Sequence, residues 1–410
     1  MCYINIEQGV HMNVKGKLVF SILGLLIGYF FIGYLTWTIQ NEDIALVILL
    51  IVLFITINKF KLVKYKKECI KIILIATMIS YLSNSLYLYH DGVEIQFPSK
   101  IESDFQINKK DAVIFVFPAN PPVYQQDNWS QVIHNSNEYS DFKKSVFSSF
   151  ILYKYKNIYK QIGKDPSEEL SIAFFKELKE KNFENKKLYI SFLNHKPILE
   201  EQIIEAMQQG AEKIYIVNML LDQSDQWFEI QERIEKIRFY NYKTQFLYVD
   251  PFWKSTELIK SYTEEIQKAI HETNKENIGI LFIGKGYKKN IAEEYTDSIY
   301  QQTVFAREIK DKLVIDGYDE NNIMISYLND ERFSIKEVLP QLLEEGVTAL
   351  VVVPIYIPFK NLESKVMIPE MVHKIDIPPS IEIKHITGWN LEKEFIEEIE
   401  NSIASMEKKA

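Results

Sequence analysis

The chain has 410 residues, of which 47% are hydrophobic, and a formal net charge of −9. This negative charge excludes non-specific nucleic-acid binding as the role of the whole protein. Both cysteines, Cys2 and Cys69, lie near the N-terminus. The rest of the chain therefore needs no disulfide framework and cannot hold a thiolate zinc or iron–sulfur site.

Three apolar stretches occupy the first part of the chain, at Leu18–Ile39, Ile44–Asn58 and Ile72–Leu88. The first two reach or approach the length of about 20 residues that crosses a hydrocarbon core. The third is more polar in its second half, so it either spans the bilayer, lies on its surface or is a soluble helix. We therefore predict that residues 1–90 form a membrane region with two or three transmembrane helices.

The distribution of lysines predicts how this region is oriented in the cell membrane. The connection between the second and third stretches carries Lys59, Lys61, Lys64, Lys66 and Lys67. By the positive-inside rule, this connection lies in the cytoplasm. A multi-pass arrangement with three spans then places the rest of the chain outside, whereas two spans keep it in the cytoplasm.

Residues 91–110 are polar and are predicted to be a linker. Strand-like and helical patterns alternate after it, which is typical of an α/β fold with parallel sheets. Strands are predicted at Ala112–Phe117, Leu188–Phe192, Lys213–Val217, Thr244–Val249, Ile278–Ile283, Asn322–Ser326, Thr348–Val353 and Ile381–Ile386. Helices are predicted at Pro197–Gly210, Ser224–Phe239, Ser255–Glu272, Asp297–Ile315, Ser334–Glu345 and Asn390–Lys408.

The predicted strands fall into two sets of four with similar spacing, which indicates an internal duplication. We predict two Rossmann-like halves, residues 111–275 and 276–410, each with a four-stranded parallel sheet. The loops that follow the strands are expected to line a shared cleft. Residues 118–165 are an extra segment of the first half, rich in Asn, Ser, Tyr and Phe. We predict that this segment is a lid, or a flap that faces lipid or ligand.

Three stretches of this region carry motifs. Leu188–Ser224, with His195-Lys196-Pro197, is similar to a G-x-K-H-x-x-P turn and the strand after it. Ile278–Ile283, followed by Gly284-Lys285-Gly286-Tyr287, looks like a strand that ends in S-A-H-S or G-H-G-S. Val351–Glu363 resembles a V-P-V/I-x-F-x-x-D-H-L-E strand and loop. In this order and spacing, the motifs resemble those of the class II chelatases, and of ferrochelatases in particular.

The resemblance implies that a tetrapyrrole binds between the halves and that a divalent metal, Fe²⁺ in ferrochelatases, enters it without an organic cofactor. By position, Glu363 matches the family's active-site glutamate and His195 matches the histidine of its turn. These two are the implied metal ligands and, with Lys285, the implied catalytic residues. The residues implied to line the ring are Phe117, Pro118, Asn120, Tyr287, Tyr356 and Asn361.

Lys285 departs from the family pattern, because it stands where the family has a metal-binding, proton-accepting histidine. Lysine has a pKa of about 10.4 and is normally a cation, which repels Fe²⁺. Only burial that lowered this pKa by several units would make it a base or ligand. Each implied residue also has a structural interpretation: Glu363 as a helix-start carboxylate, His195 as a packed turn residue and Lys285 as a surface lysine.

Two functions remain open at this point. The first is a membrane-anchored, ferrochelatase-like enzyme of haem biosynthesis. The second is a catalytically degenerate chelatase-fold protein that binds haem, another tetrapyrrole or a metal for capture, sensing or transfer at the membrane. An outward-facing domain favours the second function, since the resemblance implies a cytoplasmic task for the enzyme.

Overall fold

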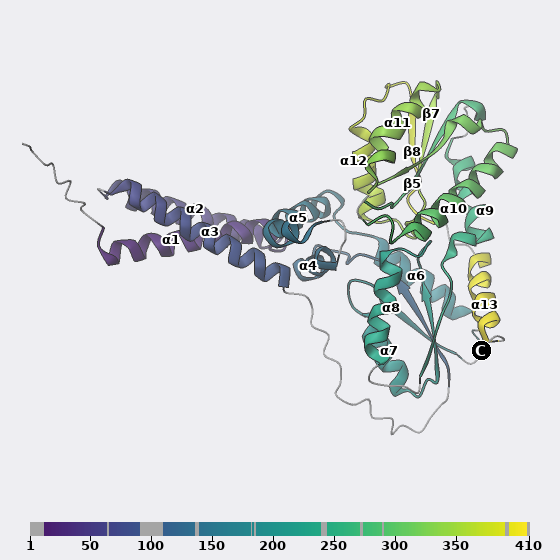
Figure 1. Cartoon of the computed structure of the whole chain (residues 1–410), viewed down its shortest axis with the longest axis horizontal. Coiled ribbons are helices and arrows are strands. Elements are labelled where there is room, and N and C mark those ends of the chain that lie inside the picture. The colour runs from purple at the N-terminus through teal and green to yellow at the C-terminus, as the bar shows by residue number, and fades with distance from the viewer. Residues whose placement is uncertain are drawn as a thin grey trace, which may run out of the picture. The chain divides into compact units, whose positions relative to one another are not determined.

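The computed structural model describes residues 12–63, 65–90, 110–135, 139–181, 183, 186–238, 244–270, 274–288, 291–389 and 393–407. The chain forms two compact units (Figure 1). The helical unit contains Met1–Glu94 and Tyr124–Lys160, and the α/β unit contains Ile95–Val123 and Gln161–Ala410. Residues 91–109 of the predicted linker lie outside the described residues.

The helical unit is built on three long helices, α1 (Val14–Thr36), α2 (Glu42–Lys61) and α3 (Lys66–His90). All three are long and apolar enough to cross a membrane, including the third, which the sequence left open. Helices α1 and α3 pack closely because Gly24 and Gly28 have no side chain at the contact. A Cβ at Gly24 would lie 2.7 Å from the Ala76 Cβ, and one at Gly28 would lie 2.7 Å from the Ser80 Cβ.

Two further helices, α4 (Gln126–Asn135) and α5 (Asp141–Ile162), belong to the same unit although they follow the first strand of the α/β unit in sequence. The Tyr81 hydroxyl of α3 donates to the Val146 carbonyl of α5 at 2.8 Å. The sequence predicted a lid, or a flap that faces lipid or ligand, in this segment. Its described part from Tyr124 to Lys160 forms helices that pack with the apolar helices.

The α/β unit contains two four-stranded parallel sheets, with the orders β2-β1-β3-β4 and β6-β5-β7-β8. Both halves thus have the same topology, and the predicted fold of two similar α/β halves is confirmed. The strands agree with the predicted ones to within about two residues. They are β1 (Ala112–Phe117), β2 (Lys187–Phe192), β3 (Lys213–Asn218), β4 (Gln245–Tyr248), β5 (Ile278–Gly284), β6 (Ile323–Tyr327), β7 (Ala349–Pro354) and β8 (Glu382–His385).

Helices cover the sheets, as expected for parallel strands joined by crossovers. They are α6 (Ser167–Glu180), α7 (Leu199–Gln208), α8 (Asp225–Arg238), α9 (Thr256–Ala269), α10 (Thr296–Ile315), α11 (Ile335–Glu344), α12 (Ile368–His373) and α13 (Lys393–Glu407). Gly210 and Gly346 follow α7 and α11 with φ of 84° and 81°, the conformation in which a glycine commonly ends a helix. Helix α7 begins after Pro197 rather than at it, because Ile198 is its N-cap.

One hydrophobic core is shared by the two sheets. Alternate residues of β1, such as Phe115, and of β5, such as Phe282, belong to the same cluster as residues of α6, α9, α10 and α13. The outer face of the first sheet packs on α7 and α8, and that of the second on α11 and α12. Because the strands of each sheet are parallel, the loops after them gather at one edge, where the candidate site lies.

Candidate functional site

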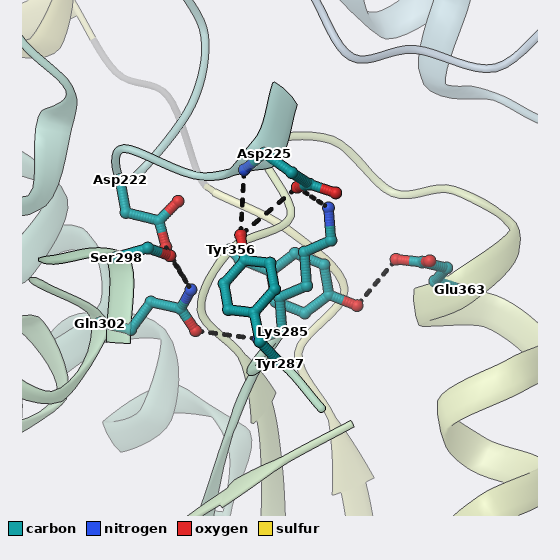
Figure 2. A network of polar contacts seen from close by, with 8 residues as sticks. All are labelled: Asp222, Asp225, Lys285, Tyr287, Ser298, Gln302, Tyr356 and Glu363. Carbon is teal, nitrogen blue, oxygen red and sulfur yellow. Dashed lines mark hydrogen bonds and ion pairs between the residues drawn. The ribbon is translucent and has the colours of Figure 1, made fainter. Parts of the chain in front are cut away.

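A network of polar side chains joins the two halves at the carboxyl ends of the strands (Figure 2). Its members come from the loops after β3 and β5, from the segment after β7, and from α8 and α10. We call it the Lys285 network, and it comprises Asp222, Asp225, Lys285, Tyr287, Ser298, Gln302, Tyr356 and Glu363.

Lys285, directly after β5, forms an ion pair with Asp225, the first residue of α8. The Lys285 Nζ lies 2.6 Å from Asp225 Oδ1, and the two side chains are 24% and 19% exposed. Tyr287 completes this part of the network, because its hydroxyl donates to Asp225 Oδ1 at 3.3 Å and accepts from the Asp225 N–H at 3.1 Å. The pair therefore ties the loop after β5 in the second half to the start of α8 in the first half.

Lys285 remains a cation in this setting. Burial by itself lowers the pKa of Lys285, but the charge of Asp225, and then Tyr287 and Glu363, raise the pKa above its usual value. The burial that the sequence reasoning required for a neutral lysine is therefore outweighed by neighbouring negative charge. A protonated ammonium has no lone pair, so Lys285 can neither accept a proton nor bind a metal.

Glu363 belongs to the same network, and its negative charge also raises the pKa of Lys285 (Figure 2). It opens a π-helical turn, Glu363–Met367, that follows the loop after β7. The Tyr356 hydroxyl donates to Glu363 Oε2 at 2.7 Å, which holds the carboxylate in place. The sequence predicted that Glu363 and Lys285 would belong to one site, and the structure brings them together with Asp225 as a second carboxylate.

Asp222 is a buried carboxyl group behind the ion pair, with 3% exposure. Its Oδ2 accepts hydrogen bonds from the Gln302 amide and from the Ser298 hydroxyl. Burial raises the pKa of Asp222 to about 6, against the opposing effect of the Gln302 hydrogen bond and the Lys285 charge. Gln302 also accepts the Lys285 backbone N–H at 2.9 Å, so it couples this carboxyl group to the Lys285 loop.

The glycines beside Lys285 allow the loop to pack closely. Gly286 has φ of 58°, a conformation that favours glycine. A Cβ at Gly284 would lie 2.7 Å from the Tyr327 ring, and one at Gly286 would lie 2.5 Å from the Tyr327 Cβ. The chain therefore makes a tight turn at Gly284-Lys285-Gly286, and this turn presents Lys285 to the first half.

His195 lies apart from this network. Its Nε2 is 3.0 Å from Glu168 Oε2, and its ring stacks on Phe192 with centroids 4.4 Å apart. Burial lowers the pKa of His195 to about 4 and raises that of Glu168. The predicted pairing of His195 with Glu363 is not seen in the described residues, because the imidazole is directed to α6 of its own half.

The residues predicted to line the ring lie in three places: the hydrophobic core, the loops after the strands and the Lys285 network. Phe117 is fully buried in the core, 5.8 Å from the Phe359 ring. Asn120 donates to Asp165 Oδ2 at 3.1 Å, and the same oxygen accepts the Leu362 N–H at 2.9 Å, so this group fastens the loop after β1 to the loop after β7.

Two of the remaining ring-lining candidates are also held by neighbouring groups. Asn361 Oδ1 accepts the Ser364 N–H at 3.0 Å and so closes its own turn. Tyr287 is buried at 3% exposure and stacks on Tyr295 with centroids 4.3 Å apart. Pro118 and Tyr356 are half-buried at the strand ends. Like Asn120, these two keep part of their surface accessible to a ligand.

Sequence reasoning missed Asp225 and Asp222 as members of the site. Both follow the strand Lys213–Asn218, and acidic residues directly after a buried parallel strand were the available signal. Among the residues that the structure describes, no group of three or more His, Cys, Asp or Glu side chains is arranged to hold a metal ion.

Comparison with known proteins gives a remote likeness. No protein-family model and no curated protein matches the chain. Among solved structures, SirB from Bacillus subtilis with Fe³⁺ is 17% identical, with a TM-score of 0.47 over 73% of this chain and 98% of that chain. The cobalt complex of the sirohydrochlorin chelatase SirB from Bacillus subtilis subspecies spizizenii is 16% identical, with a TM-score of 0.45 over 72% and 93%.

A third solved structure is CbiX, described as the terminal enzyme for biosynthesis of siroheme in denitrifying bacteria. It is 9% identical, with a TM-score of 0.38 over 72% of this chain and 99% of that chain. These structures are chelatases of sirohydrochlorin and sirohaem synthesis, so the closer resemblance to ferrochelatases stays a prediction. At such values the likeness concerns the fold alone.

Proposed function

We propose that this protein is a membrane-anchored, catalytically degenerate chelatase-fold protein that binds a tetrapyrrole, such as haem, without inserting a metal into it. The motifs around His195, Lys285 and Glu363 support the ligand class, and the three apolar helices support the membrane anchor. Capture, sensing or transfer of the tetrapyrrole at the membrane is the corresponding role.

The observation that carries this proposal is the ion pair between Lys285 and Asp225. Metal insertion requires groups that remove the pyrrole protons and that deliver a metal through exchangeable ligands. The resemblance places the proton acceptor at Lys285, but here that position is an ammonium held 2.6 Å from a carboxylate. The same position therefore supplies a fixed positive charge and no base.

His195 does not replace the missing base. Its Nε2 is directed to Glu168, whereas Glu363 accepts the hydrogen bond of the Tyr356 hydroxyl. A metal would thus meet Glu363 with a cation beside it, which lowers the affinity of the site for a divalent ion. Tyr356 and the exposed fraction of Lys285 remain accessible, and they offer a tetrapyrrole an aromatic ring and a charge for a carboxylate.

Metal insertion is the second candidate, and one observation favours it. Asp225 and Glu363 bring two carboxylates from opposite halves into the same network, and the charge of each raises the pKa of Lys285 (Figure 2). If ligand binding moved Lys285 aside, these carboxylates would be free to take up a divalent metal. This candidate predicts activity in the unmodified protein, which the first does not.

Titration of the full-length protein with protoporphyrin IX, haem and sirohydrochlorin, followed by absorbance, separates the two functions. We expect a Soret shift on binding and no metalloporphyrin after anaerobic addition of Fe²⁺ or Zn²⁺. Tyr356→Ala should weaken binding, and Lys236→Met, at a side chain of α8 that is 62% exposed, should not. Turnover of Fe²⁺ or Zn²⁺ would establish the second candidate. Absence of any tetrapyrrole binding would remove both.

A further inference from the structure

Helix α5 lies across one end of the three apolar helices. Helices α1 and α3 run in the same direction, because Gly24 packs on Ala76 and Gly28 on Ser80. Their C-terminal ends are therefore at the same end of the bundle. Helices α1, α3 and α5 all belong to the helical unit, and α5 contacts the bundle at this C-terminal end.

The contacts of α5 change from one helix to the other along its length. Its first half meets α3, where the Ser148 hydroxyl donates to the Ser85 carbonyl at 3.3 Å. Its second half meets the connection of α1 and α2, where Lys156 Nζ lies 2.9 Å from the Glu42 carboxylate and also donates to the Tyr34 carbonyl. Helix α5 therefore bridges the C-terminal ends of the parallel helices α3 and α1.

The outer side of α5 exposes aromatic residues. Phe142, Phe147 and Phe150 are 68%, 44% and 45% exposed. They are linked to the surface of the apolar helices, because the Phe150 ring lies 6.3 Å from that of Phe31 and 6.2 Å from that of Tyr81. The Phe147 ring in turn lies 6.4 Å from Phe150. The exposed aromatic strip is thus continuous with the surface that α1 and α3 would present to lipid.

Exposed lysines accompany this strip. Lys143 and Lys154 are exposed on the side of α5 that carries Phe150. A helix with aromatic residues and lysines on its free side suits the boundary between acyl chains and headgroups, where rings enter the apolar layer and ammonium groups meet phosphates. A water-exposed surface gives no comparable reason for three large aromatic side chains on one short segment.

We propose that α5 is an in-plane membrane-interface helix whose Phe142, Phe147 and Phe150 side chains enter the bilayer beside the ends of α1 and α3. The partner is the bilayer surface itself. This inference rests on the membrane anchoring in the proposed function and is independent of the ligand. This assignment also gives the segment inserted after β1 a role. The chain of the α/β unit enters this segment before α4 and leaves it after α5, so a membrane-bound α5 would attach the chain to the bilayer.

Spin labels on the full-length protein in lipid nanodiscs test this assignment. Single cysteines replace Phe142, Phe147 or Phe150 in a Cys2→Ser background, with the buried Cys69 left in place. Collision with O₂ and with the water-soluble relaxation agent NiEDDA reports the depth of each label. Ile55 of α2, 42% exposed, is the matched membrane control, and Lys236 of α8 is the water control.

We expect the labels on α5 to lose NiEDDA accessibility and retain O₂ accessibility, as at Ile55. Accessibility to NiEDDA like that at Lys236 would overturn the proposal, because the strip would face water. Low accessibility to both agents would also overturn it, because the strip would be covered by protein. If the label at Ile55 itself is accessible to NiEDDA, the membrane anchoring fails first. Three independent positions keep the test valid if one label prevents folding.

Discussion

The Lys285 ammonium and the Asp225 carboxylate lie 2.6 Å apart although they belong to opposite halves of the α/β unit. This ion pair does two things at once. It keeps Lys285 protonated at the position where metal insertion would need a base, and it fastens the loop after β5 to the first turn of α8.

Breaking the pair should destabilise the α/β unit. Removal of one partner leaves a largely buried charge, and because each side chain is about one-fifth exposed we expect a coupling of about 1–3 kcal/mol. A double-mutant cycle of Asp225→Asn and Lys285→Met, measured by urea unfolding, gives this coupling directly. The exposed pair Glu232 and Lys236 on the same helix is the matched control, for which we expect less than about 0.5 kcal/mol. Equal couplings at the two pairs would contradict the structural role.

Replacement of the cation by a ligand should create a metal site. In Lys285→His a neutral imidazole joins the carboxylates of Asp225 and Glu363, which is a ligand set that zinc accepts. We expect Zn²⁺ to bind at least about tenfold more tightly than to the unmodified protein, which is about 1.4 kcal/mol. Calorimetric titration measures this, with Lys285→Met as the control that removes the charge and adds no ligand. The same affinity in all three proteins would show that the carboxylates do not converge on this position.

Asp222 should make the stability of the protein depend on pH. The pKa of Asp222 is about 6 in the folded chain, whereas the ordinary value for an aspartic acid, 3.8, applies to the unfolded chain. As pH rises, the unfolded chain therefore loses this proton at a lower pH than the folded chain. Stability therefore falls between about pH 4 and pH 6, by up to about 3 kcal/mol for a shift of about two units.

Asp222→Asn should abolish this part of the pH dependence, because the amide oxygen still accepts from Gln302 and Ser298 but cannot ionise. Urea unfolding of both proteins at several pH values gives the difference between them. The variant should gain relative stability as pH rises from about 4 to 6. A difference that stays constant with pH would mean that Asp222 is not a buried acid.

The strands were predictable from sequence because buried parallel strands are uniformly apolar. Ala349–Pro354, for example, is within one residue of its prediction and is buried along its whole length. The helices of the inserted segment were not predictable in the same way. In α5 one side packs on the apolar helices and the other exposes Phe142 and Phe147, so no single apolar stripe marks the helix.

The sequence predicts site residues that directly follow a single strand. Glu363 and Lys285 follow β7 and β5, and the structure places both in one network. The partner of Lys285 was not predictable, because Asp225 comes from the other half and only tertiary packing brings it near. His195 also follows a strand, but the neighbouring Glu168 and Phe192 fix the direction of its ring, and no local pattern encodes that choice.

Packing of α1 on α3 should depend on Gly28. A side chain there would meet the Ser80 Cβ and the Thr77 carbonyl, each 2.7 Å from the added Cβ, so Gly28→Leu should separate the helices. We expect a loss of about 1–3 kcal/mol, as for overpacking in a protein core. Thermal unfolding in detergent measures it, with Leu25→Ile on the same helix as the control because the Leu25 side chain is 42% exposed. An unchanged midpoint for Gly28→Leu would exclude this contact.

The orientation of the chain decides on which side of the membrane the Lys285 network meets its ligand. Helices α1, α2 and α3 are all long enough to span, and the lysines between α2 and α3 favour the cytoplasm for that connection. The C-terminus should therefore lie outside, so alkaline phosphatase fused after Ala410 should be active and a green fluorescent protein there should be dark. Replacement of Lys59, Lys61, Lys64, Lys66 and Lys67 by Gln should weaken this preference. A fluorescent C-terminal fusion would place the site in the cytoplasm, where newly made porphyrin would reach it, and would favour metal insertion over capture.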